Sequence, residues 1–145
     1  MPGTRYLLLL GLMATPAHAW DFTPGAPCVL THDTPQAQIE LTYDPTAPLY
    51  SITITRAEPW PDASSFAMRF DGPQGRVIGT DSHQLSRDGR SLTVTDKGLG
   101  NVLDGVQFNR TAIASSGDVE ISIPLDGASE PVAAFRACEG TALSS

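Results

Sequence analysis

The sequence predicts an all-β protein, an antiparallel β-sandwich or flattened barrel with a short C-terminal helix tied back by one disulfide. Three observations carry this prediction. Apolar and polar residues alternate in several short segments, turn-forming residues separate those segments, and two cysteines lie near opposite ends of the chain that follows residue 19. Many short strands at regular spacing are typical of sandwiches and barrels.

The clearest strands are predicted at residues 37–43 and 50–54, where every second residue is apolar and the residues between are polar. A period of two indicates half-buried strands. The segment between them holds two prolines and an aspartate, so a hairpin is expected. Further strands are expected at 66–70, 76–79, 92–94, 112–114 and 119–123, with helices at 98–106 and at 129–138, the second capped by Ser129.

The first residues have the pattern of a secretory signal peptide. One positive charge at Arg5 precedes an apolar run, and the small residues Ala17 and Ala19 close the segment. Cleavage after Ala19 would make Trp20 the first residue of the mature chain. The apolar run is shorter than the roughly 20 residues that a membrane-spanning helix needs. We therefore expect a periplasmic or secreted protein with no membrane span.

The length of 145 residues suits a single folded domain. The expected organisation is a signal peptide at residues 1–19, one β domain at residues 20–138 and a disordered tail at residues 139–145. The tail shows no hydrophobic pattern.

The two cysteines, Cys28 and Cys138, are expected to form the disulfide. An even pair of cysteines in an exported chain is typical of a bond that an oxidising compartment maintains. In the predicted terminal helix, Val132, Phe135 and Cys138 fall three residues apart on one face. The bond would then hold the buried face of this helix against the strand that contains Cys28.

The charge of the chain excludes one class of partner. Removing residues 1–19 removes Arg5 and no acidic residue, which leaves eight basic residues against sixteen acidic ones and a formal charge of −8. Proteins that bind nucleic acids neutralise phosphates with Lys and Arg, and Lys97 is the only lysine here. Nucleic-acid binding is therefore not expected.

The Asp-Gly pair at 88–89 predicts a hairpin in a defined register. Leu85 would lie opposite Leu92, and His83 would lie opposite Val94. The next pair on the same face would be Asp81 opposite Asp96.

This register places two carboxylates and one imidazole on one face. Asp81, His83 and Asp96 could together hold a divalent cation or supply an acid and a base. The alternative is that His83 lies at the rim of the hairpin and hydrogen-bonds to an aspartate, since one imidazole is few for zinc. A metal-dependent hydrolase centred on these residues is thus one functional hypothesis.

Trp60 stands between Pro59 and Pro61, which stiffen the loop around it. This arrangement could present the ring to a sugar, a peptide or a partner protein. The alternative, which we favour, is a ring that folds back and covers an open end of the sandwich. His32 and Asp33 are adjacent in a predicted strand and would point to opposite faces.

Other catalytic motifs are not found. The sequence has no Gly-x-Ser-x-Gly motif, no phosphate-binding glycine loop and no dinucleotide fingerprint, so no cofactor is expected.

Two resemblances bear on the class of protein. The segment from Val119 to Ala128, followed by the helix from Pro131 to Cys138, resembles the end of small periplasmic proteins of the invasion-associated locus B type, in which a strand, a Leu-x-Gly turn and a short helix close the domain. This resemblance implies a fold only, because these motifs carry no catalytic residue.

The whole chain is also similar to short, uncharacterised exported proteins of Gram-negative bacteria. Some of these carry the name of the helicase-type component of excinuclease ABC. A helicase of that type needs a Gly-Lys pair in its ATP-binding loop, and no Gly-Lys pair occurs here. The residues therefore contradict that name.

These observations favour an exported, non-catalytic binding or interaction module whose partner is another macromolecule or protein of the cell envelope. Loops at the two ends of a sandwich are common binding sites. The metal-dependent hydrolase remains the alternative.

Overall fold

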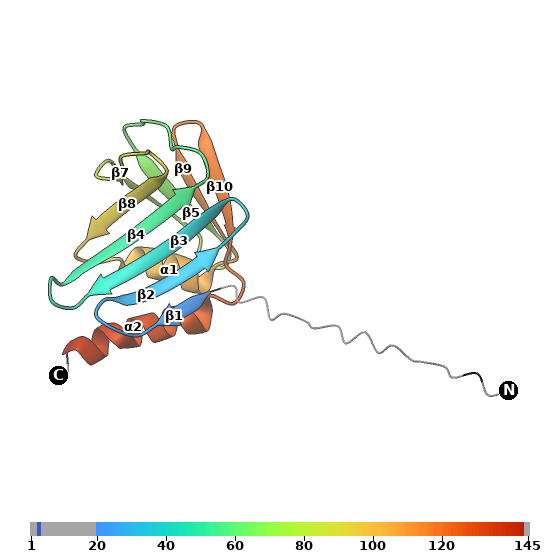
Figure 1. Cartoon of the computed structure of the whole chain (residues 1–145). Helices are drawn as coiled ribbons and strands as arrows, with labels where there is room; N and C mark the ends of the chain where they lie inside the picture. The colour runs from blue at the N-terminus through green and yellow to red at the C-terminus, as the bar shows by residue number, and fades with distance from the viewer. Residues whose placement is uncertain (1–2, 4–19, 144–145) are drawn as a thin grey trace.

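The structure, a computed structural model, describes residue 3 and residues 20–143, with side chains described through residue 138. Two antiparallel sheets face each other, and two helices lie at one end of the sandwich (Figure 1). One sheet, sheet A, has six strands in the order β1-β2-β3-β4-β8-β7, and the other, sheet B, has four in the order β10-β9-β5-β6. The predicted all-β sandwich is confirmed. The predicted signal peptide, with the exception of residue 3, lies outside the described residues.

Each predicted strand and both predicted helices are present. The strands are β1 (Asp21–Thr23), β2 (Cys28–Asp33), β3 (Ala37–Asp44), β4 (Leu49–Arg56), β5 (Phe66–Asp71), β6 (Arg76–Thr80), β7 (Gln84–Leu85), β8 (Ser91–Asp96), β9 (Thr111–Ser116) and β10 (Val119–Pro124), and the helices are α1 (Gly100–Phe108) and α2 (Ser129–Leu143). The short strand β1 was not predicted, because three residues cannot show an alternating pattern.

Sheet A is built around the hairpin of β3 and β4. Their register places Ile39 opposite Ile54 and Leu41 opposite Ile52, so every second residue points into the core. The opposite face of this sheet bears polar side chains, and hydroxyls of neighbouring strands are hydrogen-bonded across it, as between Thr53 and Thr93 at 3.0 Å. After β4 the chain crosses to sheet B, forms β5 and β6, and returns to pair β8 with β4.

The core lies between the two sheets and continues beneath the helices. Its largest fully buried side chains include Phe70 of β5, Leu41 of β3 and Phe135 of α2. Helix α1 approaches sheet B closely at Gly105, where an added Cβ would lie 2.5 Å from the Phe70 ring. A glycine is therefore needed at this position for α1 to reach its place.

Helix α2 lies along the edge of sheet A and is joined to it by the Cys28–Cys138 disulfide, which confirms the predicted pairing. Val132 and Phe135 on the same face are fully buried, as their spacing predicted. Cys28 belongs to the second strand, since β1 precedes it.

The two ends of α2 differ from the prediction. Ser129 is the first helical residue and not the N-cap, and the Ala128 carbonyl accepts a hydrogen bond from the Val132 amide at 2.9 Å. At the other end the helix continues to Leu143, which lies within the segment predicted to be a disordered tail. No proline follows Cys138 to stop the helix. Residues 144–145 lie outside the described range.

Candidate ligand cleft

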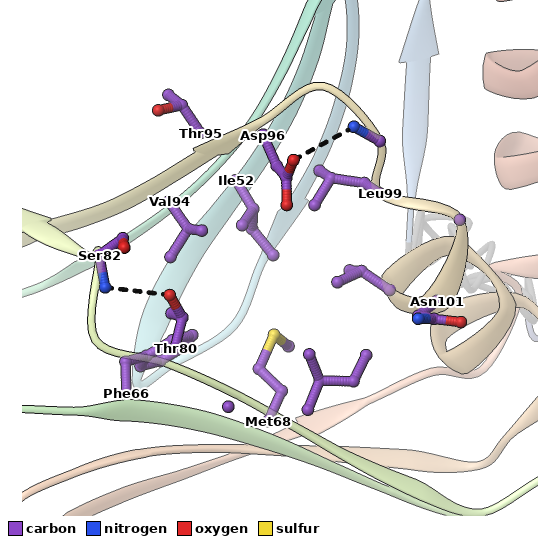
Figure 2. Close-up of a pocket in the computed structure, with 15 residues that line it drawn as sticks. Ile52, Phe66, Met68, Thr80, Ser82, Val94, Thr95, Asp96, Leu99 and Asn101 are labelled. Carbon is purple, nitrogen blue, oxygen red and sulfur yellow. Dashed lines mark hydrogen bonds between the residues drawn. The ribbon is translucent and has the colours of Figure 1, made fainter.

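A cleft of about 620 Å³ opens between the sheets, where β6 of sheet B and β8 of sheet A face each other (Figure 2). The first turn of α1 forms a third wall. Apolar side chains from both sheets and from α1 line the interior: Ile52, Phe66, Met68, Ile78, Val94, Leu99 and Val102. Clefts of roughly 300–1,000 Å³ are typical ligand sites.

Polar groups line the rest of the cleft: Thr80, Ser82, Thr95, Asp96 and Asn101. Asp96 is fixed by the turn that follows it, because its Oδ1 accepts a hydrogen bond from the Lys97 amide at 2.6 Å. Its second carboxylate oxygen points towards the interior of the cleft (Figure 2). Among the described residues that line the cleft, Asp96 is the only one with an ionisable side chain.

The cleft exists because the hairpin of β7 and β8 is shorter than predicted. The predicted pair Leu85 and Leu92 is present, and Gln84 lies opposite Thr93, but the pairing ends there. The predicted pairs of His83 with Val94 and of Asp81 with Asp96 do not form. As a result, the last three residues of β8, Val94 to Asp96, have no partner strand on their outer side in the part of the chain that the structure describes.

Local hydrogen bonds explain why residues 81–83 leave the sheet. The Ser82 amide donates to Thr80 Oγ1 at 3.0 Å, which turns the chain directly after β6. The His83 Nε2 lies 3.1 Å from the Ala63 carbonyl oxygen, so the imidazole is held by the loop before β5. The contact of His83 with Ala63 joins segments twenty residues apart and carries no sequence signal, which is why the cleft could not be predicted.

The three residues of the metal hypothesis take separate roles. His83 contacts Ala63, Asp96 holds the turn after β8, and Asp81 Oδ1 lies 3.4 Å from the neighbouring Ser82 hydroxyl. Within residues 20–138, no group of three or more His, Cys, Asp or Glu side chains is placed to hold a metal ion. The geometry of the described residues therefore gives the metal-dependent hydrolase no support.

Trp60 lies in the core, where the folded-back alternative places it. The ring is 3% exposed, its Nε1 donates to the Ile54 carbonyl at 3.0 Å, and Phe66 packs edge-on against it. The Arg56 guanidinium covers the ring at 5.2 Å from its centroid. A ring in this position is not presented to a partner.

His32 and Asp33 point to opposite faces of β2, as predicted, with His32 buried and Asp33 exposed. The imidazole stacks on Trp20, with ring centroids 4.5 Å apart. Burial lowers the pKa of His32, and the nearby carboxylates of Asp33 and Asp21 oppose this shift in part.

Comparisons of this chain with protein-family models, with curated proteins and with solved structures find no match. In the described part of the chain, no helix combines the length and the apolar character needed to cross a membrane. The geometry of the cleft is therefore the basis for assigning a function.

Proposed function

We propose that this chain is an exported binding protein of the periplasm or the cell exterior, and that the cleft between β6 and β8 binds its ligand without catalysing a reaction. The cleft itself is the observation that carries the proposal. It combines a volume of about 620 Å³, which is in the range of ligand sites, with a lining that supplies both apolar side chains and hydrogen-bonding groups. The bound group is part of a macromolecule or protein of the cell envelope.

The chemistry of the lining favours binding over catalysis. General acid–base catalysis uses ionisable groups placed close to a reacting atom, most often two with different pKa values. Asp96 is the single ionisable side chain among the described lining residues, and its Oδ1 already accepts a hydrogen bond from the Lys97 amide.

Two features support export. The Cys28–Cys138 disulfide suits an oxidising compartment. Trp20, which cleavage after Ala19 would make the first residue, is 6% exposed and stacks on His32. Cleavage at that point would leave every described core residue in the mature protein.

A fluorescent titration tests the proposal. The mature, oxidised protein is titrated with N-phenyl-1-naphthylamine, a neutral apolar dye that becomes bright in an apolar site. We expect saturable binding at one site. Ile78→Trp places a large ring in the cleft and should weaken binding by at least about tenfold, which corresponds to about 1.4 kcal/mol.

Val77→Trp is the matched control, because Val77 is the neighbour of Ile78 on β6 and its side chain is 69% exposed. It should bind the dye like the wild type, and both variants should melt within a few degrees of it. Absence of saturable binding, or equal binding by the two tryptophan variants, would contradict the proposal.

A further inference from the structure

Two strand edges border the cleft. β6 is the last strand of sheet B and pairs only with β5, and Ile78 to Thr80 of this strand line the cleft. Across the cleft, Val94 to Asp96 of β8 lie beyond the end of β7 and also line it. In an antiparallel strand, alternate residues direct their N–H and C=O groups to each side. Each edge therefore offers backbone donors and acceptors to whatever enters the cleft.

The edge of β6 is only partly protected against another strand, because α1 contacts the strand near Arg76 and the residues after Arg76 carry no charge. Proteins shield exposed edges with Lys, Pro, bulges or a covering element. β6 contains no Lys and no Pro, and its one charged residue, Arg76, is engaged with Asn101 at 3.3 Å and Asp104 at 3.9 Å. Val77 is exposed, and Gly79 has only the Phe66 carbonyl oxygen, at 3.8 Å, near the position of a Cβ.

We infer that the ligand of the cleft is an extended segment of another polypeptide, which pairs with β6 as an additional strand of sheet B. This inference rests on the proposed function and names its ligand class. The backbone of the segment pairs with β6, and alternate side chains enter the apolar interior formed by residues such as Met68 and Val94. A rigid apolar molecule would use the interior but not the strand edge.

Charge restricts the segment further. Asp96 turns one carboxylate oxygen into the cleft (Figure 2), and Asp81 follows β6 directly. No Lys or Arg is among the described lining residues, and the chain after residue 19 has a formal charge of −8, with eight basic against sixteen acidic residues. The segment that fits carries basic side chains between its apolar ones.

Hydrogen–deuterium exchange of the mature, oxidised protein tests the inference with a seven-residue capped peptide of alternating Lys and Val. We expect the peptide to displace the naphthylamine dye and to slow exchange of the β6 amides at least tenfold. A peptide with the same side chains but N-methylated at alternate residues loses the donors of one edge. It should bind at least tenfold more weakly.

Asp96→Asn tests the charge argument, with a peptide of alternating Thr and Val as the neutral probe. The variant should bind the Lys peptide several-fold more weakly and bind the neutral peptide as the wild type does. Equal loss for both peptides, or no loss for either, would overturn the assignment of the basic side chains.

Other outcomes separate this inference from the proposed function. If the dye binds but neither the Lys–Val peptide nor the Thr–Val peptide does, the ligand is a small molecule. The inference then fails while the proposed function stands. The inference also fails if the N-methylated peptide binds as well as its parent, or if the amides protected from exchange lie outside β6. It fails as well if dimerisation protects the β6 amides in the absence of peptide. If the dye itself does not bind, the proposed function fails.

Discussion

The disulfide should contribute several kcal/mol to the stability of this domain. It joins residues separated by 110 positions, from β2 to α2. In the chain-entropy model, closing a loop of that length removes about 16 cal/mol/K from the unfolded chain, or about 4.8 kcal/mol at 25 °C. The test compares the melting temperature of the oxidised wild type with that of the double variant Cys28→Ala, Cys138→Ala and with that of the wild type in reductant.

The expected shift in melting temperature follows from the size of the domain. A domain of about 120 residues has an unfolding entropy of about 0.25 kcal/mol/K near its midpoint, so 4.8 kcal/mol corresponds to about 19 °C. Measured losses for small secreted domains run from about 2 to 5 kcal/mol, which gives a range of about 8 to 20 °C.

Circular dichroism melts of the oxidised wild type, the reduced wild type and the double variant would measure these shifts. The reduced protein and the variant should agree, and reductant should not affect the variant. A decrease in melting temperature of less than about 2 °C in both the reduced wild type and the double variant would refute the reasoning, because it would mean that the bond does not restrict the unfolded chain.

Three further predictions concern single side chains. Gly105→Ala should destabilise the protein by about 1–3 kcal/mol in urea unfolding, because its Cβ would lie 2.5 Å from the Phe70 ring. Gly98→Ala is the control, since the space around Gly98 is open and no steric clash is expected. Equal losses of stability in the two variants would contradict the close packing of α1. Burial lowers the pKa of His32 below 6.5, so the unfolded chain binds the proton more tightly than the folded protein does. Stability should therefore fall as the pH decreases through about 6.5 towards the folded-state pKa. His32→Gln should flatten this part of the profile of unfolding free energy against pH, and an unchanged slope in this variant would exclude the assignment. Asp96→Asn should change the free energy of unfolding by no more than about 0.5 kcal/mol, since an amide oxygen can still accept the hydrogen bond from the Lys97 amide. Added Zn²⁺ or Mn²⁺ should not alter the melting temperature of the wild type or of the variant. A rise of several degrees in the wild type alone would support a metal site at Asp96.

The strands were predictable because their side chains alternate with the period of a half-buried sheet. In β3 and β4, Ile39, Leu41, Ile52 and Ile54 are apolar and buried, and the residues between them are polar, so the pattern defines both the strands and the faces that pack together. The disulfide followed from the number of cysteines and the helical spacing of Cys138 with Phe135 and Val132.

The cleft was not predictable by the same reasoning. The turn at 88–89 correctly predicts that Leu85 lies opposite Leu92, but it cannot show how far the pairing continues. That limit is set by the contact of His83 with Ala63, twenty residues earlier in the chain. A binding site formed where strand pairing ends depends on tertiary contacts that alternation does not encode.

The folded-back position of Trp60 was favoured only because tryptophan is highly buried on average. The prolines on either side indicate a stiff loop, but they do not show which way the ring turns. The Ile54 carbonyl, which accepts the indole hydrogen bond, decides this in the folded protein.

Methionine labelling gives the most direct test of the account. The chain has three methionines, Met1, Met13 and Met68, so the mature protein that begins at Trp20 contains only Met68, which lines the cleft. Protein labelled with carbon-13 at the methionine methyl group and isolated after export should show one methyl signal. That signal should move in a saturable way with the naphthylamine dye in the wild type, and in Ile78→Trp the same movement should need at least about tenfold more dye. More than one methyl signal would contradict export with cleavage after Ala19, and a single signal that stays fixed while the dye binds would contradict the cleft as the ligand site.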